Sequence, residues 1–282
     1  MRLDYDQVVA ALRLDHDPWT ARPLSEQHLP GRLQRRLGYK RAPGELTWQE
    51  AESRARQQRH GRTDSTPYPP KVDLRDLGGL NFVTPVRDQG ECRACVAFAV
   101  LATLETTMQV KAGRPDPDLD FSEAHLFHCS AGCMKCAFGW QIPLAVERLK
   151  TEGVVDDSCL RYEPAGGCGK LCDDWAGCLT RIRGAEHIID DPAEAKKWLA
   201  TAGALIGTME VHEDFYFYAS GGYKYEIGAR AGSHAVCCIG YDDDMRHWIC
   251  KNSWGPTWGT GGFFSIRYGE CGFGAEMWKL LT

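Results

Sequence analysis

Apolar runs of helical length dominate the first part of the chain beyond residue 90. The run from Val96 to Lys111 predicts a largely apolar helix that ends before Gly113. A second helix is predicted from Ile142 to Thr151, where Gly153 follows the last turn as a typical C-terminal glycine. A third is predicted from Pro192 to Ala202, because proline is favoured in the first turn of a helix.

Short segments rich in aromatic and β-branched residues follow, and glycines separate them. They predict strands in ALIGTMEV, GGYKYEI, HAVCCIGYD, HWICKNSW and GGFFSIRYG. Helices in one half and antiparallel strands in the other indicate an α+β fold of two parts with a cleft between them.

Residues 1–66 differ in composition from the rest of the chain. They contain no cysteine and are rich in arginine and glutamine, as in RLQRRLGYKR and WQEAESRARQQRHGR, which predicts a separable helical segment. The stretch TDSTPYPPK at its end holds three prolines among polar residues and predicts an extended linker. We therefore expect two parts, residues 1–66 and residues 67–282.

Composition and charge exclude some function classes. The chain has 282 residues, 43% hydrophobic and 25% charged, and a formal net charge of -5, so it offers no basic field for nucleic acid or an anionic membrane. The sequence shows no apolar run of membrane-spanning length, and its N-terminus does not have the pattern expected of a signal peptide. We expect a monomer with a peptide or small-molecule partner, cytoplasmic if Met1 is the native start and secreted or vacuolar if a signal was removed.

Two cysteines in DQGECRACVAFAVLATLE raise the question of chemistry. A Cys-x-x-Cys pair such as Cys92 and Cys95 serves as a zinc hook, a redox couple, or one structural and one reactive thiol. Cys95 would lie in the first turn of the apolar helix, where free amides and the helix dipole lower a thiol pKa to roughly 3.5 to 7.5. Thirteen cysteines leave at least one unpaired, and Cys95 is our candidate.

A possible base and its orienting group lie far downstream. His234 stands in AGSHAVCCIGYD, and a strand histidine by itself is more often a packed residue than a base. Asn252 follows at the end of the next predicted strand in HWICKNSWGPTWG, and an asparagine amide orients an imidazole much as a carboxylate does. Together they favour a Cys-His-Asn arrangement.

These segments together resemble the papain-like cysteine peptidases. VDLRDLGGLNFVTPVRDQGECRACVAF matches the family's mature start and its Gln-Gly-x-Cys-x-x-Cys block, and SHAVCCIGY and KNSWGPTWGTGGFF match its His and Asn blocks. The resemblance covers about residues 71–282, including FYFYASGGYKY, and His234 follows Cys95 by 139 residues (234 - 95). It implies the papain-like fold, a helical half that carries the nucleophile helix and a barrel-like antiparallel half.

The resemblance also implies roles for individual residues. Cys95 is the implied nucleophile, His234 its base and later general acid, and Asn252 the group that orients His234. Gln89 would donate to the oxyanion beside the Cys95 amide, and Trp254 would shield the bond between Asn252 and His234 from water. The implied mechanism requires no cofactor and no metal.

Three departures from the family pattern bear on substrate binding. Arg93 replaces a glycine; it would narrow the first subsite or favour an acidic group, or it would point to solvent. Val96 replaces a tryptophan near the histidine. Phe138 and Gly139 match the family's paired glycines that receive substrate backbone, so one glycine is lost, and we expect narrow specificity.

Glu276 stands five residues after Cys271 in CGFGAEMW. The family uses that place to line the second subsite, and an acid there, as in cathepsin B, admits a basic side chain. The alternative is an exposed surface glutamate.

The remaining cysteines leave alternatives open. The resemblance implies that Cys92 is structural and pairs with Cys136, and that Cys129 pairs with Cys159. Extra to the family pattern are Cys133, Cys168, Cys172 and Cys178, and Cys271 lacks its usual partner. The cluster of Cys129, Cys133, Cys136, Cys168 and Cys172 also has metal-like spacing, so zinc is the alternative to disulfides, which we favour. We expect buried free thiols at Cys237, Cys238 and Cys250.

The resemblance implies that residues 1–66 form a propeptide that blocks the cleft until it is removed; a permanent regulatory segment is the competing interpretation. The chain is thus predicted to be a cysteine peptidase made as a latent zymogen and acting through an acyl-thioester at Cys95. Acyl transfer to an amine, as in a peptide ligase, is one alternative. An inactive binding protein is another, and the presence of Gln89, Cys95, His234 and Asn252 together argues against it.

Overall fold

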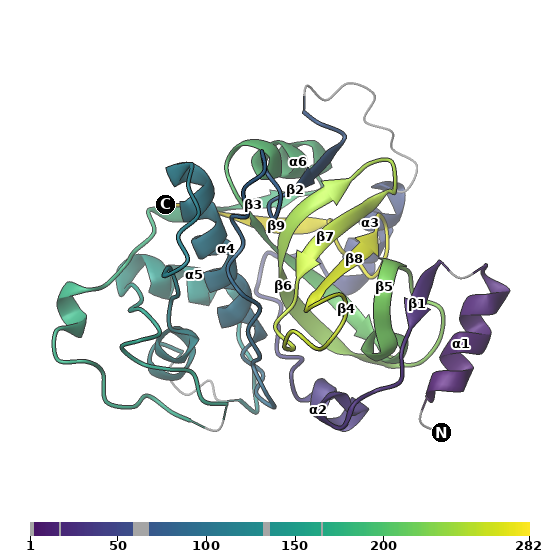
Figure 1. The fold of residues 1–282 in the computed structure, drawn as a ribbon, viewed down its shortest axis with the longest axis horizontal. Coiled ribbons are helices and arrows are strands. Elements are labelled where there is room, and N and C mark those ends of the chain that lie inside the picture. The colour runs from purple at the N-terminus through teal and green to yellow at the C-terminus, as the bar shows by residue number, and fades with distance from the viewer. Residues whose placement is uncertain (1–2, 17, 59–67, 132–135, 165) are drawn as a thin grey trace.

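A computed structural model describes residues 3–16, 18–58, 68–131, 136–164 and 166–282. Its longer helices and its strands run in the order α1 (Tyr5–Leu14), β1 (Trp19–Ala21), α2 (Pro30–Gln34), α3 (Trp48–Gln58), β2 (Lys71–Asp73), α4 (Cys95–Ala112), α5 (Ile142–Thr151), β3 (Gly184–Ile189), α6 (Pro192–Thr201), β4 (Leu205–His212), β5 (Tyr218–Tyr223), β6 (Arg230–Asp242), β7 (His247–Lys251), β8 (Phe263–Arg267) and β9 (Glu276–Leu281). The helices α4 and α5 lie on one side of the view and most of the sheet lies on the other (Figure 1). The predicted α+β fold is confirmed.

One sheet collects the strands in the order β1-β5-β8-β7-β6-β4-β9-β3, and β2 pairs with β6. The pairs are antiparallel, as expected, except that β5 runs parallel to β8 through Gly222 and Ser265. The predicted strand GGYKYEI is wrong at both ends, since β5 begins at Tyr218 and stops at Tyr223. Beyond Tyr223 the amides bond side chains instead of a strand: the Tyr225 amide donates to Glu270, and the Asp214 carboxylate accepts the amides of Glu226 and Ile227 at 2.8 and 3.1 Å.

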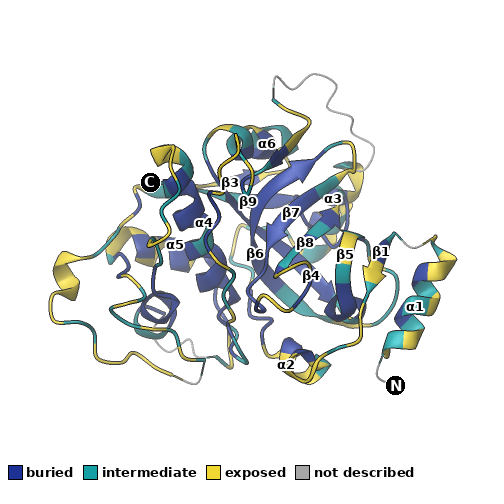
Figure 2. Cartoon of the chain, viewed as in Figure 1, coloured by how far each residue is buried: buried dark blue, intermediate teal, exposed yellow. Residues whose placement is uncertain are grey.

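The helix α4 forms the centre of the helical half. By length and composition α4 could span a membrane. Most of its residues are buried inside the fold, however, so here it is a core helix (Figure 2). It ends at Gly113, whose φ of 66° is the left-handed conformation that a C-terminal glycine adopts easily. Its first residue is Cys95, and the helix packs against β6 of the sheet.

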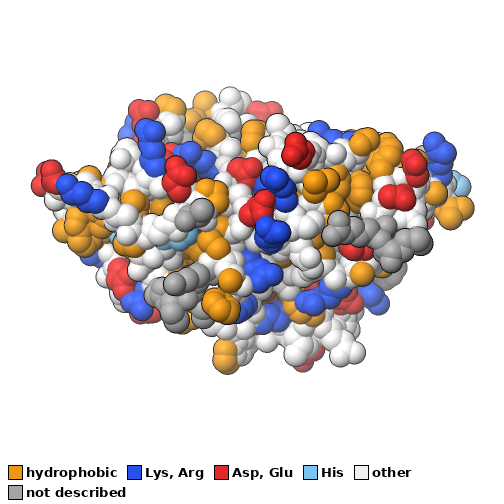
Figure 3. All heavy atoms as spheres, turned by 90° about the horizontal axis from the view of Figure 1, so that it is seen from below, with side chains coloured by type: hydrophobic (Ala, Val, Ile, Leu, Met, Phe, Trp, Pro, Cys, Tyr) orange, Lys and Arg blue, Asp and Glu red, His pale blue; other side chains and the backbone are white. Residues whose placement is uncertain are grey.

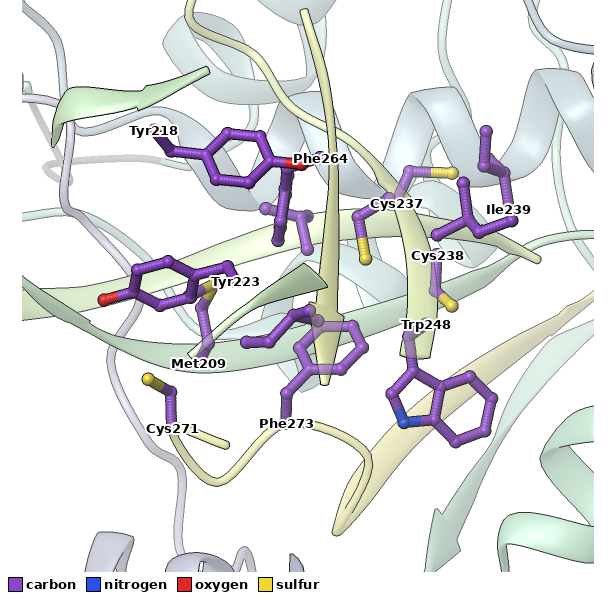
Figure 4. Close-up of a cluster of buried hydrophobic side chains, with 14 of the residues drawn as sticks. Met209, Tyr218, Tyr223, Cys237, Cys238, Ile239, Trp248, Phe264, Cys271 and Phe273 are labelled. Carbon is purple, nitrogen blue, oxygen red and sulfur yellow. The ribbon is translucent and has the colours of Figure 1, made fainter. Parts of the chain in front are cut away.

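A second core fills the barrel-like half. Figure 4 shows Tyr218, Tyr223, Trp248 and Phe273 around the sulfurs of the sheet. Cys237, Cys238 and Cys250 are buried there as free thiols, which confirms the prediction.

The segment of residues 1–66 is helical in part, as predicted, but it is not separate from the rest of the fold. Strand β1 extends the sheet by pairing Trp19 with Gly221 of β5. Trp19 is 1% exposed, and with Leu33 and Leu37 it belongs to the same core as the sheet. Residues 63–67 of the predicted linker lie outside the described residues, and the boundary at residue 66 stays a prediction.

The disulfides correct one predicted pair and confirm another. Cys92 pairs with Cys136 as expected. The pair Cys129 and Cys159 is wrong: Cys129 bonds Cys168, and Cys159 bonds Cys172, whose amide also donates to the Cys159 sulfur. Four of the five proposed zinc ligands are therefore in disulfides, and Cys133 lies outside the described residues.

Candidate active site

Cys95 is buried where the first turn of α4 meets the sheet. Backbone groups of Ala235 on β6, and of Gly38 and Tyr39 from the N-terminal segment, face its sulfur. Burial raises the pKa of the thiol to about 11, although these backbone groups act to lower it. The expected lowering of the pKa by the helix dipole is therefore wrong for this closed arrangement, because the segment removes the thiol from water.

His234 and Asn252 form the predicted pair. The Asn252 Oδ1 accepts the Ser253 amide at 2.8 Å, so it is the oxygen, and it also accepts from His234 Nε2 at 2.8 Å. The other ring nitrogen, Nδ1, is then left unprotonated in the neutral ring, and it has no hydrogen-bond partner among the described residues. Burial lowers the pKa of His234 to about 4, although the bond to Asn252 opposes this.

Trp254 closes the pair off from solvent. It is fully buried, and its ring lies 5.0 Å from the His234 ring, centroid to centroid. This is the place expected for a side chain that shields the bond between His234 and Asn252.

Gln89 is fully buried and held at both ends of its amide. Ser253 Oγ donates to its Oε1 at 2.7 Å, and its Nε2 donates to the Cys92 carbonyl at 2.6 Å. The same Nε2 also donates to the Arg36 carbonyl at 2.9 Å. Neither Ser253 nor Arg36 was predicted as a site residue from the sequence; the only signal for Ser253 was its position next to Asn252.

The N-terminal segment passes between the two halves of the fold as an extended chain. On one side Trp140 donates its amide to the Gly38 carbonyl at 2.8 Å, and Lys40 donates to the Trp140 carbonyl at 2.9 Å. On the other side the Tyr39 amide donates to the Ser233 carbonyl at 3.3 Å. Gly139, at φ +74°, lies so close that a Cβ on it would overlap the Gly38 carbonyl.

The two substitutions at the rim lie beside this segment. Phe138 is 56% exposed, and the Lys40 ammonium lies 5.6 Å from its ring centroid. Arg93 is half-buried and donates through Nη1 to the Ala137 carbonyl at 2.5 Å. This hydrogen bond joins Arg93 to the loop before Phe138, and its expected effect on the first subsite stays a prediction. Val96, fully buried, is not part of the rim.

Glu276 is 3% exposed, so the interpretation as an exposed surface residue is wrong. It forms an ion pair with Arg41 of the N-terminal segment, lies 3.1 Å from His187 Nε2, and accepts the Leu46 amide at 2.9 Å. Burial acts to raise the pKa of Glu276, but these three partners outweigh it and the net pKa is lowered.

Charges on the outside of the molecule are mixed. Basic and acidic side chains lie side by side near the middle of the face seen from below (Figure 3). Within the described residues no three His, Cys, Asp or Glu side chains are grouped so that they could hold a metal ion.

A cysteine at a helix start, whose sulfur faces the backbone next to the histidine of a His-Asn pair, between a helical and a β-rich half, is the arrangement of a cysteine peptidase of the papain type. The profile described as papain family cysteine protease matches residues 68–279, and the chain belongs to that family. Cathepsin B-like CP3 of Giardia intestinalis is 33% identical over 230 residues, which cover 77% of this chain and 76% of that protein.

Solved structures agree on the fold. The procathepsin B S9 of Trypanosoma congolense superposes with a TM-score of 0.78 at 20% identity and covers 98% of this chain and 97% of its own. Bromelain from Ananas comosus, in a complex with the inhibitor E64, superposes with a TM-score of 0.63 at 28% identity and covers 76% of this chain and 99% of its own. The expected family, fold and peptidase class are confirmed.

Proposed function

We propose that this chain is the latent precursor of a cysteine peptidase, in which Cys95 attacks the peptide bond and residues 1–66 act as an inhibitory propeptide. One observation carries the proposal. The segment places its Arg36 carbonyl on the side-chain amide of Gln89 and its next residues over Cys95, so the segment and a substrate cannot occupy the site together.

The geometry supports a specific division of labour among the reactive groups. With Nε2–H donated to Asn252, the free Nδ1 of His234 takes the proton of Cys95, and the thiolate attacks the scissile carbonyl. The oxyanion accepts from Gln89 Nε2 and the Cys95 backbone amide. His234 returns its proton to the leaving amine, and water then hydrolyses the acyl-thioester.

We further propose that the contacts of the segment mark the substrate subsites. Gly139 and Trp140 would receive substrate backbone as they receive Gly38 and Lys40, with Phe138 and Arg93 restricting the rim. Trp254 shields the His234 pair. Glu276, which holds Arg41, would accept a basic substrate side chain. Such a site favours a narrow set of peptides, and rapid cleavage of many unrelated unstructured proteins would contradict this.

Mass spectrometry after incubation with E-64, an epoxide that alkylates reactive papain-type thiols, tests the proposal. In wild type we expect trimming near residues 63–71 and one adduct, on Cys95, in the trimmed product; the Cys95→Ala chain should show neither. If the wild-type chain stays intact, takes up E-64 and is fully active, residues 1–66 are a permanent regulatory segment and not a propeptide. A wild type whose segment has been removed and that still takes up no E-64 would refute the catalytic role of Cys95.

A further inference from the structure

A cavity of about 570 Å³ lies in the helical half, and Cys95 is not among the residues that line it. Its volume is in the range of pockets that bind small molecules. The peptidase mechanism proposed above makes no use of it.

The lining of this cavity is strongly acidic. It contains two basic residues, Arg87 and Arg161, and seven acidic ones: Asp88, Asp118, Asp120, Glu123, Asp156, Asp157 and Glu163. Arg87 forms ion pairs with Asp120 and Asp157 and so neutralises only part of the negative charge. The cavity therefore attracts cations.

Glu123 is the feature that distinguishes this cavity from an ordinary acidic surface. It is 4% exposed and lines the cavity, and its carboxylate accepts a hydrogen bond from its own backbone amide but has no hydrogen bond or ion pair with another described residue. Burial raises the pKa of Glu123 to about 8; the nearby Glu105 and Asp157 add to the shift, and Arg87 opposes it. A buried carboxyl whose only hydrogen bond comes from its own amide is costly to ionise, and a bound cation would stabilise the charged form.

The remaining walls suit a cation carried on a carbon chain. The rings of Phe98 and Tyr162 line the cavity and meet edge to face, with centroids 4.8 Å apart. Aromatic faces bind both methylene groups and ammonium groups. The wall has already accepted one such group, because the buried guanidinium of Arg36 donates to Asp88 at 2.6 Å.

We propose that this cavity binds a flexible organic cation, an alkylammonium or guanidinium chain that packs against Phe98 and Tyr162 and reaches Glu123 with its charged end. The chemistry is shared by free linear polyamines and by lysine or arginine side chains of a polypeptide. Tyr162 also donates its hydroxyl to the Gln89 carbonyl at 3.0 Å, so an occupant would contact a side chain bonded to the loop that carries the oxyanion donor.

Titration calorimetry with the full-length Cys95→Ala chain, which cannot digest itself, tests the site. Spermidine and tetralysine are the two probes, both at constant ionic strength. Saturable binding of spermidine would indicate a free polyamine as the ligand, and saturable binding of tetralysine alone would indicate side chains of a polypeptide. At pH 7.5 the binding should release protons, because a neighbouring cation lowers the pKa of Glu123. The observed enthalpy should then differ between phosphate and Tris buffers.

Matched variants separate the site from general charge attraction. Glu123→Gln should weaken binding at least tenfold and abolish the proton release, while Asp244→Asn, which removes the same charge from an exposed turn, should leave both unchanged. If Glu123→Gln does not fold, Asp156→Asn, an exposed position of the lining, should still weaken binding. No saturable binding of either probe, or equal weakening by the lining and the control variants, overturns the proposal.

Discussion

The side-chain amide of Gln89 lies 2.9 Å from the backbone carbonyl of Arg36, a residue of the chain's own N-terminal segment. The donor proposed to stabilise the reaction's oxyanion is therefore already in use before any substrate arrives. The proposed latency therefore has two parts, since the segment covers Cys95 and also occupies the hydrogen-bonding group beside it.

Replacing Gly38 by alanine should weaken inhibition by the segment. A Cβ at Gly38 would overlap backbone atoms of Arg93, which cannot rotate away, so the segment must shift. Overpacking of this kind costs about 1 to 3 kcal/mol, and we expect the basal peptidase activity of the full chain to rise by about tenfold. Gly31→Ala is the control, because nothing lies within 4 Å of a Cβ there. Equal activity of the two variants would show that the close approach is unimportant.

Gln89→Ala should lower kcat of the processed enzyme by about 10² to 10³ and change KM little, because the lost donor acts on charge that develops in the transition state. Ser253→Ala removes only the hydroxyl that donates to Gln89 and should lower kcat by a smaller factor. Steady-state kinetics on a fluorogenic peptide measures both. A Gln89→Ala enzyme within threefold of wild type would remove Gln89 from the mechanism.

The reactivity of Cys95 should depend on the segment. With a pKa of about 11 the thiol is almost wholly protonated at pH 7, so iodoacetamide should alkylate it slowly in the full chain and faster as the pH rises. Removal of the segment exposes Cys95 to water and should lower the pKa of its thiol. A decrease of two pKa units would increase the alkylation rate at pH 7 about a hundredfold, and we expect at least this increase. Peptide mapping in a Cys178→Ser background, which removes the exposed thiol, measures the rate at Cys95 itself.

Acid should destabilise the closed chain through His234. Its pKa is about 4 in the folded state, lowered from 6.5 mainly by burial, so above pH 6.5 the ring is neutral in both folded and unfolded chains. As the pH falls from 6.5 to 4, the unfolded chain takes up a proton that the folded chain does not, and the free energy of unfolding should fall by about 3 kcal/mol. Urea unfolding of the Cys95→Ala chain at pH 7 and pH 4.5 measures the loss. The same loss in a Cys95→Ala/His234→Gln chain would assign it to other groups.

Glu276 should control preference for basic side chains. Its carboxylate is buried and charged and holds Arg41, so we expect Glu276→Ala to reduce turnover of an Arg-Arg peptide substrate about tenfold or more while sparing a Phe-Arg substrate. The ratio of the two kcat/KM values in the processed enzyme is the measurement. A ratio unchanged from wild type would remove Glu276 from substrate recognition.

Much of the fold was readable from local pattern. The helices α4 and α5 begin or end within a residue of the predicted positions because apolar runs and terminal glycines mark them. The strands β1 and β2 have only three residues each, too few to show an alternation. β9 was missed because EMWKLL contains charged residues; one of them, Lys279, is paired with Glu186 on the neighbouring strand.

The parts of the site that could not be predicted depend on contacts distant in sequence. The helix dipole at Cys95 is a local property and was correctly placed, but the thiol pKa is set by burial under Gly38 and Tyr39, more than fifty residues upstream. The exchange of partners among Cys129, Cys159, Cys168 and Cys172 likewise follows from how two loops meet, which their spacing does not contain.

The core around Trp19 contains residues from both products of the proposed cleavage, the N-terminal segment and the processed enzyme. Trp19 bonds the Lys224 carbonyl at 2.8 Å and packs against Tyr218 and Tyr223. Cleavage would let this anchor leave and would expose the β5 edge, so the processed enzyme would keep a smaller interior than the one in which it folded. Its maturation would then be a one-way step: an enzyme unfolded after losing Trp19 would have to refold without its own template.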